Sequence, residues 1–211
     1  MRIAMNINEW PKIFQRETFS FKVLKQQLSE SEVEAIKVDY KLIWNDWKSA
    51  NLQTAAKLDL GKLKIESWTN GWKIRDHFWT CYRIGDVNPC IGVLVNRQQL
   101  QVYLMFQNYK SETRLGTSTQ YQSAVNQKLA NWQRTVNSTE YYVWPASQSE
   151  LEPHQRLDQY QASDEPVMLG KVWYFPLAEE FNFEQEVSKA VSELLPLYRE
   201  VIGSMEVAAD E

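Results

Sequence analysis

The run between Trp68 and Arg83 is the part of the chain richest in basic and aromatic side chains that could bind a ligand. If residues 74–84 form one strand, alternation places several of these side chains on one face. The residues of that face are Arg75, His77, Trp79, Cys81 and Arg83. Cationic groups beside a large aromatic ring suit an anionic or flat ligand, through cation–π contacts and hydrogen bonds. The structural alternative is that Trp79 packs under a helix while His77 and Arg83 edge a solvated sheet surface.

Aromatic residues outside that strand extend the run into a candidate patch. Trp10, Trp68 and Trp72 lie in turns or at strand ends, where large rings are hard to bury and often line pockets or partner surfaces. Tyr103 lies on the less apolar face of the next predicted hairpin. The candidate ligand-binding residues are Trp72, Arg75, His77, Trp79 and Tyr103. Their chemistry favours a small anionic or aromatic ligand, or a protein partner.

An enzymatic interpretation of the same residues would use His77 as a general base. Asp76 precedes His77, but neighbouring strand residues point to opposite faces, so their side chains cannot hydrogen-bond without a bulge. The carboxylate would have to come from elsewhere in the fold, and Arg75 or Arg83 would hold an anionic substrate. The sequence therefore assigns no catalytic residue, and such an enzyme is the alternative to a binding role.

Three amphipathic helices are expected around this region. Residues 1–28 form an irregular lead-in that ends in a helical turn, and the first long helix then starts at a capping box of Ser29 and Glu32. Its apolar residues recur at three- and four-residue steps. They are Val33, Ile36, Tyr40, Ile43, Trp44, Trp47 and Ala50. A second helix covers 119–136, and a third begins near the N-cap residue Asn182, with Pro196 expected to bend or break it.

The middle of the chain shows the two-residue period of β-strands. Predicted strands cover 63–68, 74–84, 91–95, 100–107, 141–144 and 172–175. The fourth strand is expected to be half buried, and residues 96–99 form the hairpin loop before it. Residues 147–166 are expected to form a surface helix or loop that exposes His154. These elements predict a single α+β domain over residues 1–211, with a mostly antiparallel sheet and amphipathic helices packed on one side.

The composition excludes several classes of protein. The 211 residues carry a net charge of −4, and 44% of them are hydrophobic, which is ordinary for a globular protein and disfavours a nucleic-acid partner. No two of the seven glycines lie within six residues of each other, so the chain has neither a dinucleotide-binding fingerprint nor a phosphate-binding loop. The two cysteines and two histidines lack the spacing of a zinc site. We therefore expect no metal and no cofactor.

The compartment follows from the same absence of signals. No stretch of 18 apolar residues is present, so we expect no membrane association. The first residues lack the apolar run of a signal peptide, which favours a cytoplasmic location. Cys81 and Cys90 are then expected to be reduced thiols that behave as small buried hydrophobic residues.

The order of these features resembles a known bacterial group. The chain combines the early amphipathic helix with the run Trp68-x-x-x-Trp72-Lys-Ile-Arg-Asp-His-Phe entering a hairpin, and with Leu195-Pro196-Leu197-Tyr198-Arg199 in the last helix. In these features and in its length, it resembles the small bacterial YktB-like group, and in particular a family of similar length sometimes labelled glucose-6-phosphate dehydrogenase. The resemblance implies an α+β fold over nearly the whole chain, and it carries no established activity.

The dehydrogenase label is disfavoured on physical grounds. The well-known glucose-6-phosphate dehydrogenases are more than twice this size and contain a Rossmann domain, whereas this chain has no glycine fingerprint. The leading hypothesis is a non-enzymatic binding or interaction protein of the bacterial cytosol, with the aromatic and basic patch as its binding surface.

Overall fold

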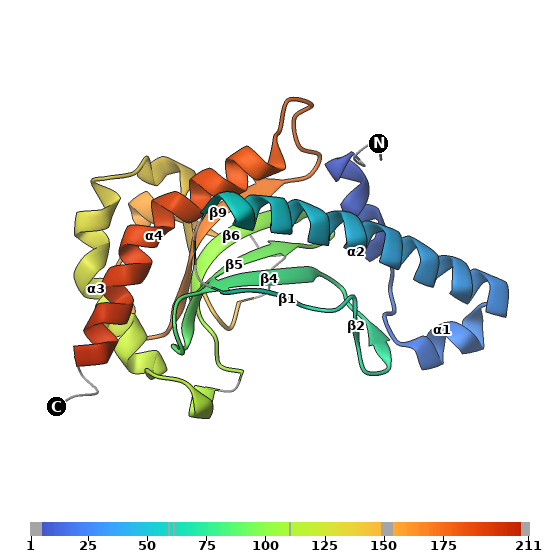
Figure 1. The fold of residues 1–211 in the computed structure, drawn as a ribbon, viewed down its shortest axis with the longest axis horizontal. Helices are drawn as coiled ribbons and strands as arrows, with labels where there is room; N and C mark the ends of the chain where they lie inside the picture. Colours follow the sequence, from blue (N-terminus) through green and yellow to red (C-terminus); the bar gives the residue numbers. More distant parts are fainter. Residues whose placement is uncertain (1–5, 59, 61, 110, 149–153, 208–211) are drawn as a thin grey trace.

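The computed structural model describes residues 6–58, 60, 62–109, 111–148 and 154–207. Within these ranges, helices α2 (Glu30–Leu58) and α4 (Phe183–Val207) pack across one face of a seven-stranded sheet (Figure 1). Helix α3 (Ser118–Gln133) packs against α4. All neighbouring strands of the sheet pair antiparallel. The predicted α+β class, with an antiparallel sheet and helices on one side, is confirmed.

The sheet has the strand order β1–β4–β5–β6–β9–β7–β8. Its strands are β1 (Lys62–Ile65), β4 (Phe78–Arg83), β5 (Pro89–Val95), β6 (Gln99–Phe106), β9 (Val167–Tyr174), β7 (Tyr142–Pro145) and β8 (Gln155–Arg156). A separate small hairpin consists of β2 (Thr69–Asn70) and β3 (Lys73–Ile74). The shorter helices are η1 (Ile7–Phe14), α1 (Phe21–Gln27), η2 (Ser111–Thr113), η3 (Ser138–Glu140) and η4 (Leu157–Gln159).

Helix α2 begins where its capping residues predict. The backbone N–H of Ser29 donates to Glu32 Oε2 at 2.7 Å, and the N–H of Glu32 donates to Ser29 Oγ at 3.4 Å. The predicted stripe is buried at Val33, Tyr40, Ile43 and Trp47. The lead-in before this helix is more regular than expected, because it contains η1 and α1.

Helix α4 is not broken at Pro196, so of the two effects expected of this residue the break is wrong. Figure 1 shows α4 changing direction along its length, which agrees with the expected bend. The side chain of Asn182 accepts a hydrogen bond from the N–H of Gln185 at 3.0 Å, as its predicted capping role requires. The helix then continues through Pro196 to Val207. A proline inside a helix costs about 3 kcal/mol. The residues around it bury the apolar side chains of Val191, Leu194, Leu197 and Tyr198. That burial offsets the missing backbone hydrogen bond.

Strand β6 is buried on both faces, so the expectation of a half-buried strand is wrong. One set of alternating residues faces the helices in the main core. The other set contributes Tyr103 to a second apolar cluster on the opposite face. The buried members of that cluster are Trp79, Cys81, Cys90, Leu94, Tyr103, Trp144 and Val172. Both thiols are free and buried, and this agrees with the behaviour expected of them.

The predicted strand over residues 74–84 is two strands. Strand β3 ends at Ile74, the chain bends at Asp76 and His77, and β4 begins at Phe78. The break arises because Ile74 pairs within the small hairpin, whereas Phe78 pairs with Val95 in the main sheet. The alternation that placed Arg75 and His77 on one face with Trp79 therefore does not apply.

Candidate functional site: an exposed tryptophan on a basic surface

The five predicted ligand-binding residues do not form one patch. Trp79 and Tyr103 do meet, but their side chains are buried in the second cluster on the face opposite the helices. Gly92 lies between them, and a Cβ added there would lie 2.8 Å from Trp79 Nε1 and 3.2 Å from the ring of Tyr103. The two rings fill the space that this glycine leaves, so they are packing residues rather than a ligand surface.

The two arginines of the run bind their own chain. Arg75 Nη1 forms an ion pair with Glu66 Oε2 at 2.8 Å, and its Nε donates to the carbonyl oxygen of Ser67 at 2.8 Å. Arg83 donates to the backbone carbonyl oxygens at the start of β5 and to the side chain of Gln107. These contacts give both guanidinium groups a structural role.

His77 does contact Asp76, contrary to the sequence argument. Its Nδ1 lies 2.8 Å from Asp76 Oδ1, and this is possible because both residues lie in the bend before β4 rather than in a strand. The hydrogen bond from His77 lowers the pKa of the Asp76 carboxyl. Asp76 remains two-thirds exposed, so this pair lies in an open setting.

Trp72 is the one predicted site residue that is strongly exposed, at 84% of its surface. It lies in the two-residue turn of the β2–β3 hairpin, because Asn70 pairs with Lys73 across it. Gly71 precedes it with φ +59°, a left-handed conformation that glycine adopts without a side-chain penalty. The turn itself therefore explains the glycine, but it does not require a tryptophan.

The hairpin that carries Trp72 is fixed to the chain before α1. The N–H of Phe21 donates to the carbonyl oxygen of Trp72 at 3.0 Å, and the N–H of Ile74 donates to the carbonyl oxygen of Phe19 at 2.9 Å. The Ile74 side chain is buried in the main core. Figure 1 shows the hairpin and α1 at the same end of the molecule. The backbone from Trp72 to Ile74 is thus held against residues 19–21.

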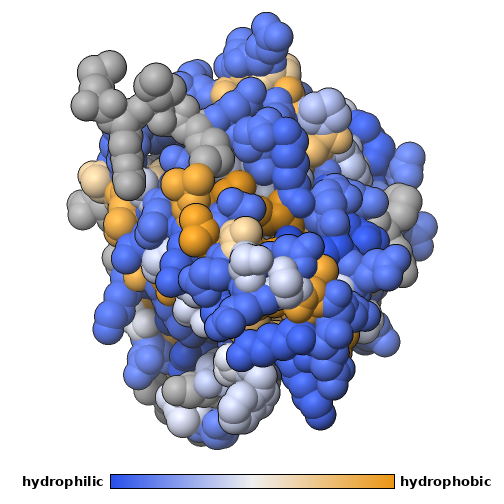
Figure 2. Space-filling model, turned by 90° about the vertical axis from the view of Figure 1, so that its right-hand side faces the viewer, coloured by the Kyte–Doolittle hydropathy of each residue, from blue (hydrophilic) through white to orange (hydrophobic). Residues whose placement is uncertain are grey.

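The two segments that meet at the hairpin are locally basic, and the acidic residues Glu17, Glu66 and Asp76 flank them directly. Residues 18–28 and 67–75, the two segments that meet at the hairpin, contain four basic residues and no acidic ones. Those residues are Lys22, Lys25, Lys73 and Arg75. Figure 2 shows this end as mostly hydrophilic, with hydrophobic atoms confined to separate patches. We call Phe21, Lys22, Lys25, Trp72 and Lys73 the hairpin surface.

The sequence argument missed the three lysines of the hairpin surface. The sequence offered only a weak signal for them, because Glu17, Glu66 and Asp76 directly flank the two lysine-bearing segments. What the sequence lacked was the pairing of Ser20 with Lys73, which brings the two segments together. Of the other tryptophans expected at turns, Trp10 is buried and Trp68 is half-buried.

His154 is buried, so its predicted surface position is wrong. Its ring stacks on Trp144 with the ring centroids 4.1 Å apart, and its Nε2 lies 3.3 Å from Gln101 Nε2. Burial lowers the pKa of His154 to about 4. A cavity of about 320 Å³ lies beside Trp144 and is also lined by Gln155 and Tyr160.

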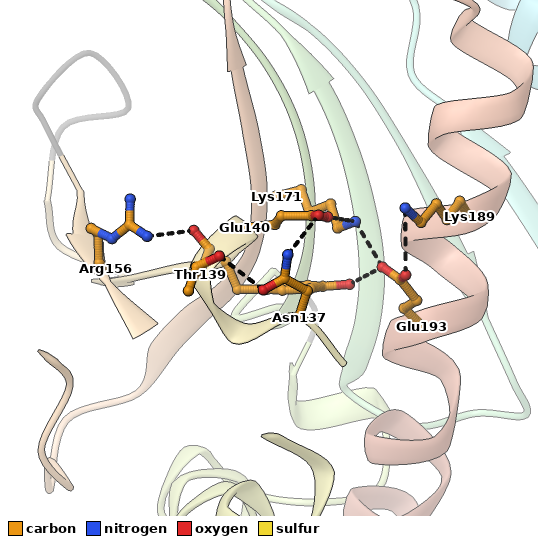
Figure 3. A network of polar contacts seen from close by, with 8 residues as sticks. Asn137, Thr139, Glu140, Arg156, Lys171, Lys189 and Glu193 are labelled. Atoms are coloured by element: carbon orange, nitrogen blue, oxygen red, sulfur yellow. Dashed lines mark hydrogen bonds and ion pairs between the residues drawn. The ribbon is translucent and has the colours of Figure 1, made fainter. Parts of the chain in front are cut away.

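A buried lysine joins two carboxylates beneath α4 (Figure 3). Lys171 Nζ lies 2.6 Å from Glu140 Oε2 and 2.8 Å from Glu193 Oε2, and the hydroxyl of Tyr141 donates to Glu193 at 2.6 Å. Burial alone would lower the pKa of Lys171, but its bonds to the two carboxylates outweigh burial and raise it. The network ties β9 to α4 and η3, and every charge in it has a partner.

The described residues contain neither a cluster of metal ligands nor a membrane-spanning helix. Within them, no group of three or more histidine, cysteine, aspartate or glutamate residues is placed to hold a metal ion. Among the same residues, none of the helices has the length and apolar character needed to cross a membrane.

Two comparisons relate the chain to known proteins. A protein-family model matches residues 7–201. An uncharacterised protein of Haemophilus influenzae is 34% identical over 121 residues, which are 55% of this chain and 58% of that protein. The aligned part thus spans less than two thirds of the relative. Neither comparison names the YktB-like group, and neither supports the glucose-6-phosphate dehydrogenase label.

Proposed function

This chain belongs to the protein family whose model spans residues 7–201, and we propose that it is a protein-binding module anchored by Trp72. The observation that carries the proposal is an 84% exposed indole on a hairpin whose backbone is hydrogen-bonded to the neighbouring segment. Tryptophan is enriched among the residues that dominate protein interfaces, because a large rigid ring buries much area at little entropic cost.

The chemistry of the hairpin surface favours one kind of partner. An apolar pocket on the partner would take the Trp72 ring, and carboxylates around that pocket would face Lys22, Lys25 and Lys73. The lysines would speed the encounter and set the orientation, while burial of the indole would supply most of the affinity. Binding should therefore weaken as the salt concentration rises.

The first test is photocrosslinking in the native host. Trp72→p-benzoylphenylalanine places a photoreactive group at the tip of the hairpin, and Tyr174→p-benzoylphenylalanine is the control at another exposed aromatic position. We expect a discrete protein adduct from position 72 that is absent from position 174. No discrete adduct at position 72, or the same adducts at both positions, would exclude the proposal.

A second arm measures the affinity of the crosslinked protein for purified variants. Trp72→Ala and the pair Lys22→Glu with Lys73→Glu should each weaken binding about tenfold or more, whereas Tyr174→Ala should not. Unchanged melting temperatures would show that the variants remain folded. Sedimentation with phosphatidylglycerol vesicles tests the alternative that the hairpin surface binds lipid. Vesicle binding without a protein adduct would overturn the proposal.

The enzymatic alternative has one favourable observation, the contact between His77 and Asp76. Its substrate-binding arginines do not support it, because Arg75 is paired with Glu66 and Arg83 lies at the far end of β4. Six residues of extended chain separate His77 from Arg83, or about 20 Å. We do not propose the dehydrogenase, because the chain lacks a dinucleotide-binding fingerprint.

Two broader parts of the hypothesis are proposed together with the binding role. We propose that the protein acts in the cytoplasm, which fractionation of the native host would test. We also propose that residues 1–211 form a single domain, which a single cooperative unfolding transition would support.

A further inference from the structure

A cleft of about 930 Å³ lies between η1, the middle of α2 and the start of α4. The Trp10 ring lies at its base, with Nε1 donating to Asp46 Oδ2 at 2.8 Å. Leu42, which is 47% exposed, borders the cleft, and Ile7 and Phe181 also line it. The volume falls within the roughly 300–1,000 Å³ that accommodates a drug-sized ligand.

The walls of the cleft are held in place by the protein itself. The Asn8 side chain donates to the carbonyl oxygen of Leu177 at 3.1 Å and accepts from the N–H of Leu177 at 2.8 Å. The rings of Trp10 and Phe183 pack edge to face, with centroids 5.3 Å apart. These contacts fix the segment before α4 against η1, so a partner would pay little to order the cleft.

The described lining of the cleft is acidic. It includes Asp46, Glu179 and Glu184, and it contains no lysine, arginine or histidine. The start of α4 contributes a partial positive charge of about half a unit, which the three carboxylates exceed. Lys57 pairs with Glu184 from outside the lining. The cleft therefore favours a cationic group over an anionic one, and its apolar border favours a cation that carries a large ring.

The hairpin surface of the same chain has the matching chemistry. It presents one strongly exposed indole, with the exposed Lys73 next to it in the sequence and the exposed Lys22 and Lys25 on the segment that pairs with the hairpin. Glu17, Glu66 and Asp76 lie just outside these two segments. We propose that the partner of the hairpin surface is a second copy of this chain, whose cleft receives the Trp72 turn. The inference rests on the proposed function and names its partner. In the complex, the indole contacts the border at Leu42 and Phe181, while Lys73 approaches Glu179 and Asp46.

The contact joins two different surfaces, which decides the assemblies it can form. If each copy uses both surfaces with the same neighbour, the product is a closed dimer. If each copy uses them with different neighbours, the chain forms rings or longer assemblies. Both outcomes require an intact hairpin surface on one copy and an intact cleft on the other.

Mixing two single variants tests this requirement. Trp72→Ala removes the indole and keeps the cleft, whereas Glu179→Lys reverses a charge of the cleft and keeps the indole. Light scattering after size exclusion should show that the unaltered protein self-associates. The dissociation constant of each variant alone should be about tenfold higher or more. A mixture of the two should form a heterodimer, because one functional surface of each kind remains.

Matched controls separate this contact from general effects of charge and exposure. Glu180→Lys makes the same change one residue away, at an exposed position outside the cleft lining, and Tyr174→Ala removes another exposed aromatic ring. Both should associate as the unaltered protein does. A monomeric unaltered protein at all concentrations, or a mixture that stays monomeric, would overturn the inference.

The outcome separates this inference from the proposed function. An adduct at position 72 with a different protein, together with a monomeric purified chain, would retain the binding role and reject the second copy as the partner. Absence of any adduct at position 72 would reject both.

Discussion

Burial changes the acid–base chemistry of individual side chains, and His154 is the clearest case. The ring is 7% exposed and stacks on Trp144, which leaves little water to solvate a positive charge. Its Nε2 faces the side-chain amide nitrogen of Gln101, which is an N–H donor. A proton on His154 Nε2 would therefore point at the amide N–H of Gln101, and neither group could accept a hydrogen bond from the other. The low pKa of about 4 follows from burial, and this contact reinforces it.

The free energy of unfolding should depend on pH because of this histidine. Its folded pKa of about 4 lies below the unfolded value of about 6.5, so the unfolded chain binds the proton more readily. The stability contributed by neutral His154 is complete above pH 6.5 and declines as the pH falls from 6.5 to 4. We expect a loss on the order of 2–3 kcal/mol across this window, measured by urea unfolding.

His154→Gln is the control for that measurement, because glutamine does not titrate. Its free energy of unfolding should vary less with pH than that of the unaltered protein between pH 6.5 and 4. Parallel profiles for the two proteins would show that another group controls the acid limb.

At the scale of elements, local signals were sufficient for helices but not for strand partners. The Ser29–Glu32 capping box and the apolar stripe of α2 both lie within one segment, so the sequence contains all the information they need. The division of 74–84 depends on Phe78 pairing with Val95. No local period encodes that choice, because β-strands take their partners from distant parts of the chain.

The candidate site was predictable to the same limited degree. Trp72 was expected in a turn or at a strand end, and it lies in the turn of the β2–β3 hairpin. Tyr103 was placed on the less apolar face of a half-buried strand, but the second cluster on the far side of the sheet buries that face. His154 failed for the same reason, since its polar segment packs on Trp144.

Two glycines in different elements should respond oppositely to the same substitution. Gly92→Ala in β5 would bring a Cβ to 2.8 Å from Trp79 Nε1, and such overpacking should destabilise the protein by about 1–3 kcal/mol. Gly203→Ala in α4 meets no atom within 4 Å, and alanine's helix preference should stabilise it by up to about 1 kcal/mol. The urea midpoints of the two variants give both signs. A stabilised Gly92→Ala would mean that the two rings are loosely packed.

At the scale of the whole molecule, the two halves of the chain are interleaved. Strand β6 from the first half pairs with β9 from the second, so one sheet crosses the midpoint of the sequence. Helix α4 packs on α2 as well as on β5 and β6, which come from the first half. The Lys171 network then links β9 to α4 and η3. A division into two independent units would break the hydrogen bonds between β6 and β9. It would also remove the packing of α4 on α2, β5 and β6.

The interleaving predicts one cooperative unfolding transition for the 211 residues. The nine tryptophans report on both halves, because they are spread from Trp10 to Trp173. In urea, Trp fluorescence, near-ultraviolet and far-ultraviolet circular dichroism should therefore give the same midpoint. Lys171→Met leaves Glu193 without its buried cation, so it should lower all three midpoints together. Separate midpoints, or a shift in one signal alone, would show that β9 and α4 unfold independently of the first four strands of the sheet.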